Sequence, residues 1–203
     1  DWRYKGYYYL VHDKCAEIEA RKEASSWTRD KLTGLYDREG FYAAVRDEID
    51  YGMKSKHCII CSNIKDFKLV NELLGEEEGN AMLKSLAEFF SELAMASGTA
   101  GRLHSDHFAA YVDKASFTEQ ELLEGLKKIG KAFSSNAFKL NVHLGVYEIE
   151  EVQMPVSVMC DRAHLALNLV REENGNKVAF YDGDLLERTL HEKEILNSFE
   201  DGL

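Results

Sequence analysis

Short apolar or alternating segments take turns with longer amphipathic segments along most of the chain. Five strands are predicted, from runs at 57–64, 100–113 (a hairpin of two strands), 138–149 and 177–182. Apolar residues three and four positions apart predict helices over 38–51, 66–74, 80–96, 118–133 and 156–172. Strands separated by helices around one hairpin predict an α+β sandwich of the ferredoxin-like or palm type. Its central five-stranded sheet is expected to be mainly antiparallel and flanked by helices.

Local sequence patterns predict the buried face of one helix and the first residue of another. The apolar stripe expected to face the core in the first helix is formed by Phe41, Ala44, Val45 and Ile49. Thr118 followed three residues later by Glu121 is a capping-box pattern, in which each residue satisfies a backbone N–H of the other. This pattern predicts that the helix over 118–133 begins at the threonine.

The two ends of the chain differ from this central unit. Residues 1–29 pass from an aromatic, strand-like run to a charged helical run, so we expect the end of a preceding domain plus a linker helix. That helix could pair with a copy of itself or stand alone in solvent. Residues 184–203 predict an amphipathic exit helix, which leaves 30–183 as the main domain. The chain is expected to be a piece of a larger protein.

Composition and charge narrow the class of protein and of partner. Hydrophobic residues make up 45% and charged residues 30% of the 203, as in a globular protein. The net charge of −11 argues against a nucleic-acid-binding surface, which needs clustered lysine and arginine. A small anionic ligand stays compatible with it, because a local pocket or a bound cation can reverse the field. No apolar run approaches the ~20 residues that span a bilayer. We therefore expect a cytoplasmic location, with any membrane anchor elsewhere in the parent protein.

The four cysteines form no recognisable disulfide framework; they are Cys15, Cys58, Cys61 and Cys160. Cys58-Ile-Ile-Cys61 is formally a CxxC motif, but it lies in the apolar run "HCIICSNI". An offset of three on a strand directs two side chains to opposite faces, so one metal ion cannot take both. We interpret these cysteines as buried structural residues.

The hairpin "RLHSDHFAAYV" (102–112) concentrates titratable groups at a tight turn. His104, Asp106 and His107 are candidates for a transition-metal site, because imidazole and carboxylate are suitable ligands. Residues three apart across a turn need not converge, however, and turn histidines are often ordinary surface residues. Both interpretations stay open from the residues alone.

Four segments, in order and at matching spacings, carry a resemblance to a known family. They are "DKLTGLYDREGF" (30–41), "NIKDFKLVNELLGEEEGNAML" (63–83), "RLHSDHF" (102–108) and "DRAHLALNLV" (161–170). They resemble four motifs of GGDEF domains, the diguanylate cyclase family: D-x-L-T-G-L-x-N-R-x-x-F, D-[IL]-D-x-F-K-x-x-N-D-x-x-G-H-x-x-G-D-x-x-L, R-x-G-G-[DE]-E-F and A-D-x-A-L-Y-x-A-K. The resemblance implies a nucleotidyl cyclase-like fold. It also implies two GTP molecules held in a face-to-face homodimer, two divalent cations such as Mg²⁺ on the triphosphate, and cyclic di-GMP as product.

The metal-binding positions depart from the family pattern. Asn63 stands where the resemblance implies the first metal-binding aspartate, and Lys65 where it implies a second aspartate. Asp66 is adjacent, but a shift of one residue at a strand end is expected to point it the other way. Asp106 keeps an acid in the third position of the turn, which alone is insufficient to hold the metal.

The turn and the phosphate-binding positions depart as well. His104 and Ser105 replace the paired glycines that let the backbone approach the nucleotide, and His107 replaces a glutamate. Asn168 takes the place of a phosphate-contacting lysine. The product-binding RxxD motif would need Arg and Asp where Met95 and Gly98 stand.

Part of the nucleotide site matches the family better. Asn71 matches its guanine-contacting asparagine, whereas the partner aspartate has become Asn80. If a nucleotide binds, the residues expected to contact it are Asn63, Phe67, Lys68, Asn71, Asn80 and Asp106. Mg²⁺ would then accompany GTP.

We expect no cyclase activity and a degenerate, regulatory GGDEF domain of bacterial cyclic di-GMP signalling. It would act by dimerising or by binding GTP or cyclic di-GMP to control a linked domain. The tail is similar to the helix that leads into an EAL phosphodiesterase domain, and the start is reminiscent of the end of a PAS sensor domain. Two alternatives stay open. One is a weak or altered cyclase using Asp106 with Asp66 or Glu72 as substitute metal ligands. The other is a structural dimerisation spacer that binds no small molecule.

Overall fold

The computed structural model of the chain describes residues 28–52, 55–95, 98–133 and 140–184. The connector predicted over 1–29 and the exit helix predicted over 184–203 lie almost wholly outside these ranges, as does Cys15. The elements in chain order are α2 (Arg38–Gly52), β1 (His57–Ile64), α3 (Phe67–Leu74), α4 (Glu76–Ala94), β2 (Thr99–His104), β3 (His107–Asp113), η1 (Lys114–Ser116), α5 (Glu119–Phe133), β4 (Val142–Glu148), α6 (Val156–Val170) and β5 (Lys177–Phe180).

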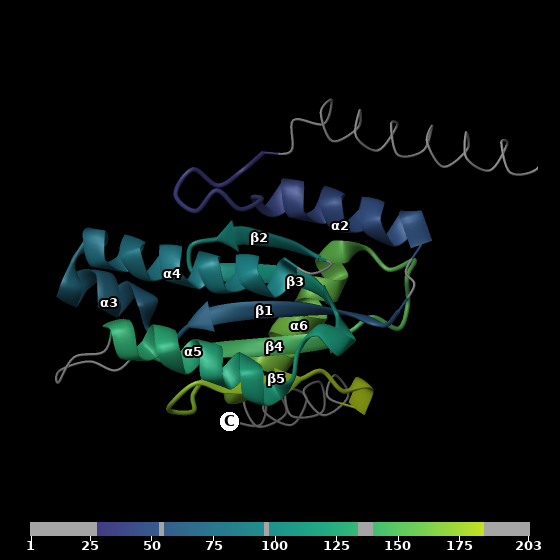
Figure 1. The fold of residues 1–203 in the computed structure, drawn as a ribbon. Helices are drawn as coiled ribbons and strands as arrows, with labels where there is room; N and C mark the ends of the chain where they lie inside the picture. Colours follow the sequence, from purple (N-terminus) through teal and green to yellow (C-terminus); the bar gives the residue numbers. More distant parts are fainter. Residues whose placement is uncertain (1–27, 53–54, 96–97, 134–139, 185–203) are drawn as a thin grey trace, which may run out of the picture.

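The five strands form one sheet in the order β2-β3-β1-β4-β5 (Figure 1). Neighbouring strands pair antiparallel except β4 and β5, which are parallel. The predicted α+β fold with a mainly antiparallel five-stranded sheet is therefore confirmed. Its central strand is β1, which pairs with β3 on one side and β4 on the other.

Helices cover both faces of the sheet, because the strands present apolar side chains to both. One core lies against α4 and α5 and includes Cys58 and Ile60 of β1 together with Phe90 and Leu126. The other lies against α2 and α6 and includes Ile59 and Cys61 of β1. The two cysteines of the CxxC motif thus face opposite layers, as strand alternation requires. Each large buried side chain contributes about 1.5–3 kcal/mol.

Most predicted helices and strands begin and end within a few residues of the observed ones, with exceptions at α4, β4 and β5. The apolar stripe of α2 is buried, and Thr118 and Glu121 form the predicted capping box, with each backbone N–H bound to the other side chain. Helix α4 begins at Glu76, earlier than the predicted residue 80. Three consecutive glutamates fill its first turn, where the positive end of the helix dipole favours carboxylates. Strands β4 and β5 are shorter than the apolar runs that predicted them.

No helix within the described ranges is long and apolar enough to cross a bilayer.

Candidate functional site

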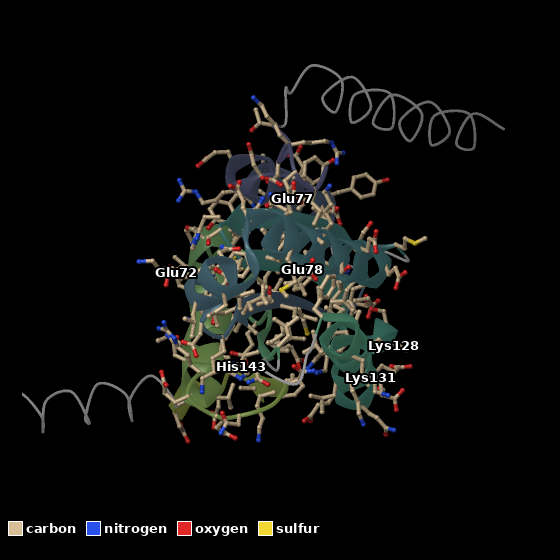
Figure 2. The ribbon with its side chains drawn as sticks, turned by 90° about the vertical axis from the view of Figure 1, so that its left-hand side faces the viewer. Glu72, Glu77, Glu78, Lys128, Lys131 and His143 are labelled. Carbon is tan, nitrogen blue, oxygen red and sulfur yellow. The ribbon has the colours of Figure 1, made fainter. Side chains whose placement is uncertain are left out.

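One end of the sheet gathers three segments that are distant in sequence: the end of β1, the β2–β3 turn, and the segment after α6. This end lies at the left of Figure 1, and Figure 2 looks onto it. A cavity of about 590 Å³ opens there. It is lined by Asn63, Ile64, Lys65, Asp66, Phe67, Lys68, Asn71, Ser105, Asp106, His107, Arg171 and Glu172.

The cavity brings together most of the residues that the sequence singled out for nucleotide contact. Asn63, Phe67, Lys68, Asn71 and Asp106 all line it. The remaining one, Asn80, lies half-buried on α4 and is not among the lining residues. Arg171 and Glu172 could not be predicted to line the cavity, because they follow α6 in a stretch without a recognisable motif.

Asp106 is held inside the protein by two donors from the end of β1. The backbone N–H of Ile64 donates to its Oδ2 at 2.8 Å, and Nδ2 of Asn63 donates to the same oxygen at 3.2 Å. The residue is only 6% exposed. The two positions where the resemblance implies metal-binding carboxylates are therefore adjacent in space. One of them is now an amide that donates a hydrogen bond to the other.

A chain of imidazoles continues from this pair. Nδ2 of Asn63 also lies 3.3 Å from Nε2 of His107, whose Nδ1 lies 3.2 Å from Nε2 of His164. His164 is hydrogen-bonded to the carbonyl of Cys160. One consistent set of protons runs through the chain when both imidazoles are neutral, with each ring donating through Nδ1 and accepting through Nε2.

Burial keeps these imidazoles uncharged. It lowers the pKa of His107 to about 4, against an opposing effect of Asp106, while His104, His164 and Arg171 lower this pKa further. Burial also lowers the pKa of His164. The cluster therefore adds no positive charge to the cavity at neutral pH.

The β2–β3 turn has a strained backbone at the position of the second glycine of the family motif. Ser105 adopts φ 45°, in the left-handed region that costs a residue with a Cβ. Arg102 holds this turn, because its Nε donates to the Ser105 carbonyl at 2.7 Å. Its Nη1 also donates to both carboxylate oxygens of Asp30, at 3.1 Å each.

Asp30 links the turn to the start of the described chain. Its Oδ1 also accepts hydrogen bonds from the backbone N–H and the hydroxyl of Thr33, at 2.9 and 2.7 Å. Burial raises the pKa of Asp30, but the hydrogen bonds from Thr33 and Arg102 outweigh it and leave this pKa below its ordinary value. The "DKLTG" stretch is thus locked to the hairpin by a partly buried ion pair.

Helix α3 borders the cavity and starts in an unusual way. Asp66 precedes it with φ 56° and ψ 34°, and no side chain caps the helix. Strand β1 ends at Ile64, so strand alternation no longer governs Asp66. Although Asp66 was expected to point away, it is among the residues that line the same cavity as Asp106. Glu72, the other proposed substitute ligand, is exposed on α3 outside the lining residues.

Asn71 is placed at the cavity by a close approach to α4. A Cβ at Gly79 would lie 1.9 Å from Oδ1 of Asn71, so a side chain at this position would displace the Asn71 amide. The family motif also has a glycine at this position, and here the absence of a side chain leaves room for the Asn71 amide.

The residues present do not fit a pair of divalent cations. Both donors to Asp106 bind the same carboxylate oxygen, Oδ2, and the neighbouring side chain is the Asn63 amide rather than a second carboxylate. In the described part of the chain, no group of three or more His, Cys, Asp or Glu side chains is arranged to hold a metal ion. The hairpin candidates do not form such a group either: the ring of exposed His104 lies against that of His107, with centroids 4.3 Å apart and planes tilted by 38°, while Asp106 accepts hydrogen bonds from the end of β1.

The positions of the RxxD product site also lack its chemistry. Met95 is 79% exposed and carries no charge. A Cβ at Gly98 would lie 2.1 Å from the backbone carbonyl oxygen of Tyr111. An aspartate at that position would require β3 to move.

The chain is similar in sequence to a known protein family and to several of its members. Residues 27–177 match the family described as diguanylate cyclase, GGDEF domain. An uncharacterized 19.3 kDa protein encoded in the repSA 5′ region of Streptomyces ambofaciens is 27% identical over 66% of this chain and 72% of its own length. The probable diguanylate cyclase DgcE of Escherichia coli is 20% identical over 80% of this chain. The matched region spans only 15% of that protein.

Solved structures share the fold. The GGDEF domain of DgcB from Caulobacter crescentus, crystallised in complex with c-di-GMP, superposes with a TM-score of 0.61 at 19% identity. That match covers 76% of this chain and 95% of DgcB's domain. The GGDEF domain of PA1120 (TpbB or YfiN) from Pseudomonas aeruginosa superposes with a TM-score of 0.63 at 18% identity, covering 81% and 99%. Because the family match extends over most of the chain and the sheet order agrees with the fold, this chain belongs to the GGDEF domain family of cyclic di-GMP signalling.

Proposed function

We propose that this chain is a catalytically inactive GGDEF domain that acts as a regulatory unit in cyclic di-GMP signalling. It binds a guanine nucleotide or dimerises, and in doing so controls a linked domain of EAL or PAS type. The hydrogen bond from Asn63 to Asp106 carries this proposal, because a neutral amide donor there takes the place of a carboxylate–metal contact.

Further features support the loss of catalysis. Replacing a first metal-binding carboxylate by an amide is expected to lower metal affinity by at least the roughly 10–100-fold that losing an outer-sphere partner costs. The lysine that follows, Lys65, adds a positive charge beside the same site. Ser105 and His104 place side chains where paired glycines would leave room for the nucleotide.

The retained cavity supports a binding role rather than a purely structural one. Asn71 and Phe67 still border a space of about 590 Å³, within the range typical of small-molecule sites. A structural spacer has no need to keep an open polar cavity at this end of the sheet.

A turnover assay tests the proposal. The purified chain is incubated overnight with GTP and either Mg²⁺ or Mn²⁺, and cyclic di-GMP and the linear dinucleotide are quantified by mass spectrometry. An active diguanylate cyclase assayed in parallel is the positive control. We expect neither product above the no-protein background. Cyclic di-GMP that forms in proportion to protein and disappears in Asp106→Asn would establish an altered cyclase instead.

A further inference from the structure

The segment that follows α6 lines one side of the cavity and begins with a cation, Arg171. Arg171 is the C-cap residue of α6 and lies three positions beyond Asn168, so the two are neighbours on the helix surface. The phosphate-contacting lysine expected at Asn168 is thus missing, and a guanidinium stands one helical turn farther along. Arg171 lines the cavity. Among the described residues, it forms neither an ion pair nor a hydrogen bond.

Lys65 fixes the backbone that carries this arginine. Its Nζ donates to the carbonyls of Glu172 and Glu173, at 2.8 and 3.4 Å. Its own backbone N–H donates to the Asn141 carbonyl at 2.9 Å. The ammonium group that replaces an acid at the end of β1 is therefore used to tie β1 to the residues directly after Arg171.

Three more contacts hold the same segment from β4. Nε2 of the fully buried His143 lies 3.1 Å from the Gly175 carbonyl, to which it donates. The Gly175 N–H donates to Oδ1 of Asn141 at 3.2 Å, and Oδ1 of Asn176 accepts from the Val142 N–H at 2.9 Å. Figure 2 shows His143 at this end of the sheet. These contacts hold the backbone next to Arg171, from which its exposed side chain extends.

The cavity is balanced in charge without a metal ion. Three basic side chains line it, and three acidic ones oppose them: Lys65, Lys68 and Arg171 against Asp66, Asp106 and Glu172. Asp106 accepts two hydrogen bonds at Oδ2, and Lys65 donates to two backbone carbonyls. The other charged lining residues without an ion-pair partner within the described ranges are two cations and two carboxylates: Lys68, Arg171, Asp66 and Glu172. The free groups that remain for a ligand thus include two cations, and a guanidinium can bind a phosphate through two parallel N–H donors.

From these contacts we infer that the cavity binds the phosphate groups of a guanine nucleotide without a divalent metal ion, with Arg171 as the principal phosphate ligand and Lys65 as the residue that positions it. This inference rests on the proposed function for the identity of the nucleotide. It adds that the affinity for GTP does not depend on Mg²⁺. It also adds that Arg171, which lies outside the four family-like segments, provides much of that affinity.

Calorimetric titration of the full chain with GTP tests this inference, once in EDTA and once in Mg²⁺. We expect the two dissociation constants to agree within about threefold. Arg171→Ala should weaken GTP binding by roughly 10–100-fold, the range expected for a charge-assisted hydrogen bond to phosphate. Arg171→Lys should recover part of that loss. Lys128→Ala is the matched control, because it removes a cation from α5 outside the cavity lining (Figure 2), and it should bind GTP like the unmodified chain.

A double-mutant cycle separates positioning by Lys65 from a general loss of stability. Lys65→Ala should weaken GTP binding in the presence of Arg171 but have little further effect in the Arg171→Ala background. Circular dichroism and thermal unfolding establish that each variant is folded.

Three results would overturn the inference: GTP binding that requires Mg²⁺, Arg171→Ala binding as tightly as the unmodified chain, or no GTP binding up to millimolar concentration. Each of these leaves the absence of cyclase activity intact. Cyclic di-GMP found in the same samples would instead overturn the proposed function, so the two failures are distinguishable.

Discussion

The side-chain amide of Asn63 donates a hydrogen bond to Oδ2 of Asp106 across 3.2 Å. The Ile64 N–H donates to the same oxygen from the same strand end. The two residues stand at the positions where the resemblance implies metal-binding carboxylates, and only one of them carries a negative charge. The cavity beside it remains open, and its formal charges cancel without an added ion.

Restoring the missing acid should destabilise the chain unless a metal ion is supplied. In Asn63→Asp, two carboxylates face each other and Asp106 loses a donor, so the free energy of unfolding in EDTA should fall by about 1–3 kcal/mol. Millimolar Mn²⁺ should recover part of this loss, because paired carboxylates suit a hard cation. Chemical denaturation in both buffers measures the effect.

Asn63→Ala is the control for that substitution. It removes the hydrogen bond without adding charge, so it should be destabilised but gain no more from Mn²⁺ than the unmodified chain. An Asn63→Asp variant as stable in EDTA as the unmodified chain would contradict the role given to the amide.

Relieving the backbone of the β2–β3 turn should stabilise the protein. Ser105 adopts a positive φ that glycine tolerates freely, so Ser105→Gly should raise the free energy of unfolding by about 0.5–1 kcal/mol. Ser105→Ala keeps the Cβ and should give no such gain. Urea denaturation of the three proteins measures the difference, and a destabilised glycine variant would show that the serine side chain outweighs the strain.

Stability should decline as the solution becomes mildly acidic. Burial lowers the pKa of His107 from 6.5 to about 4, so below pH 6.5 the unfolded chain binds a proton that the folded chain does not. The unfolding free energy therefore falls as the pH decreases from about 6.5 toward 4, and His107 contributes to this slope. His107→Gln should make the slope shallower, because it removes the imidazole whose pKa differs between the folded and unfolded chain. Equal slopes for His107→Gln and the unmodified chain would contradict this prediction.

The Asp30–Arg102 ion pair should couple the entry segment to the hairpin. Arg102→Met leaves a partly buried Asp30 without its cation, and Asp30→Asn leaves the guanidinium without its acid. Each change should destabilise the fold by about 1–3 kcal/mol, and the double variant by less than the sum. Hydrogen exchange at Ser105 and Asp106 should accelerate in both single variants, because Arg102 also holds the Ser105 carbonyl. Additive effects on stability would show that the two residues act independently.

Much of the fold could be predicted from local pattern, for identifiable reasons. The eight-residue apolar run 57–64 coincides with β1, and its alternation correctly separates Cys58 from Cys61. The Thr118–Glu121 box fixes the start of α5 by two reciprocal hydrogen bonds within one turn. Such signals need no tertiary contact to be effective.

The features that escaped prediction depend on contacts between distant segments. Helix α4 starts in a polar "EEEGN" stretch that lacks apolar periodicity, although its glutamates suit a helix N-terminus. The contact of His107 with His164 joins β3 to α6 across 57 positions. Lys65 and His143 bind backbone carbonyls of the segment that follows Arg171, and no local motif encodes those long-range hydrogen bonds.

A crystal structure of the chain grown with GTP and Mn²⁺, with anomalous data collected at the manganese edge, shows whether Asp106 holds a metal ion. We predict no anomalous peak at coordination distance from Asp106, about 2.1 Å, and an Asn63 amide still hydrogen-bonded to its carboxylate. A manganese peak coordinated by Asp106, with the Asn63 amide displaced from it, would contradict the account.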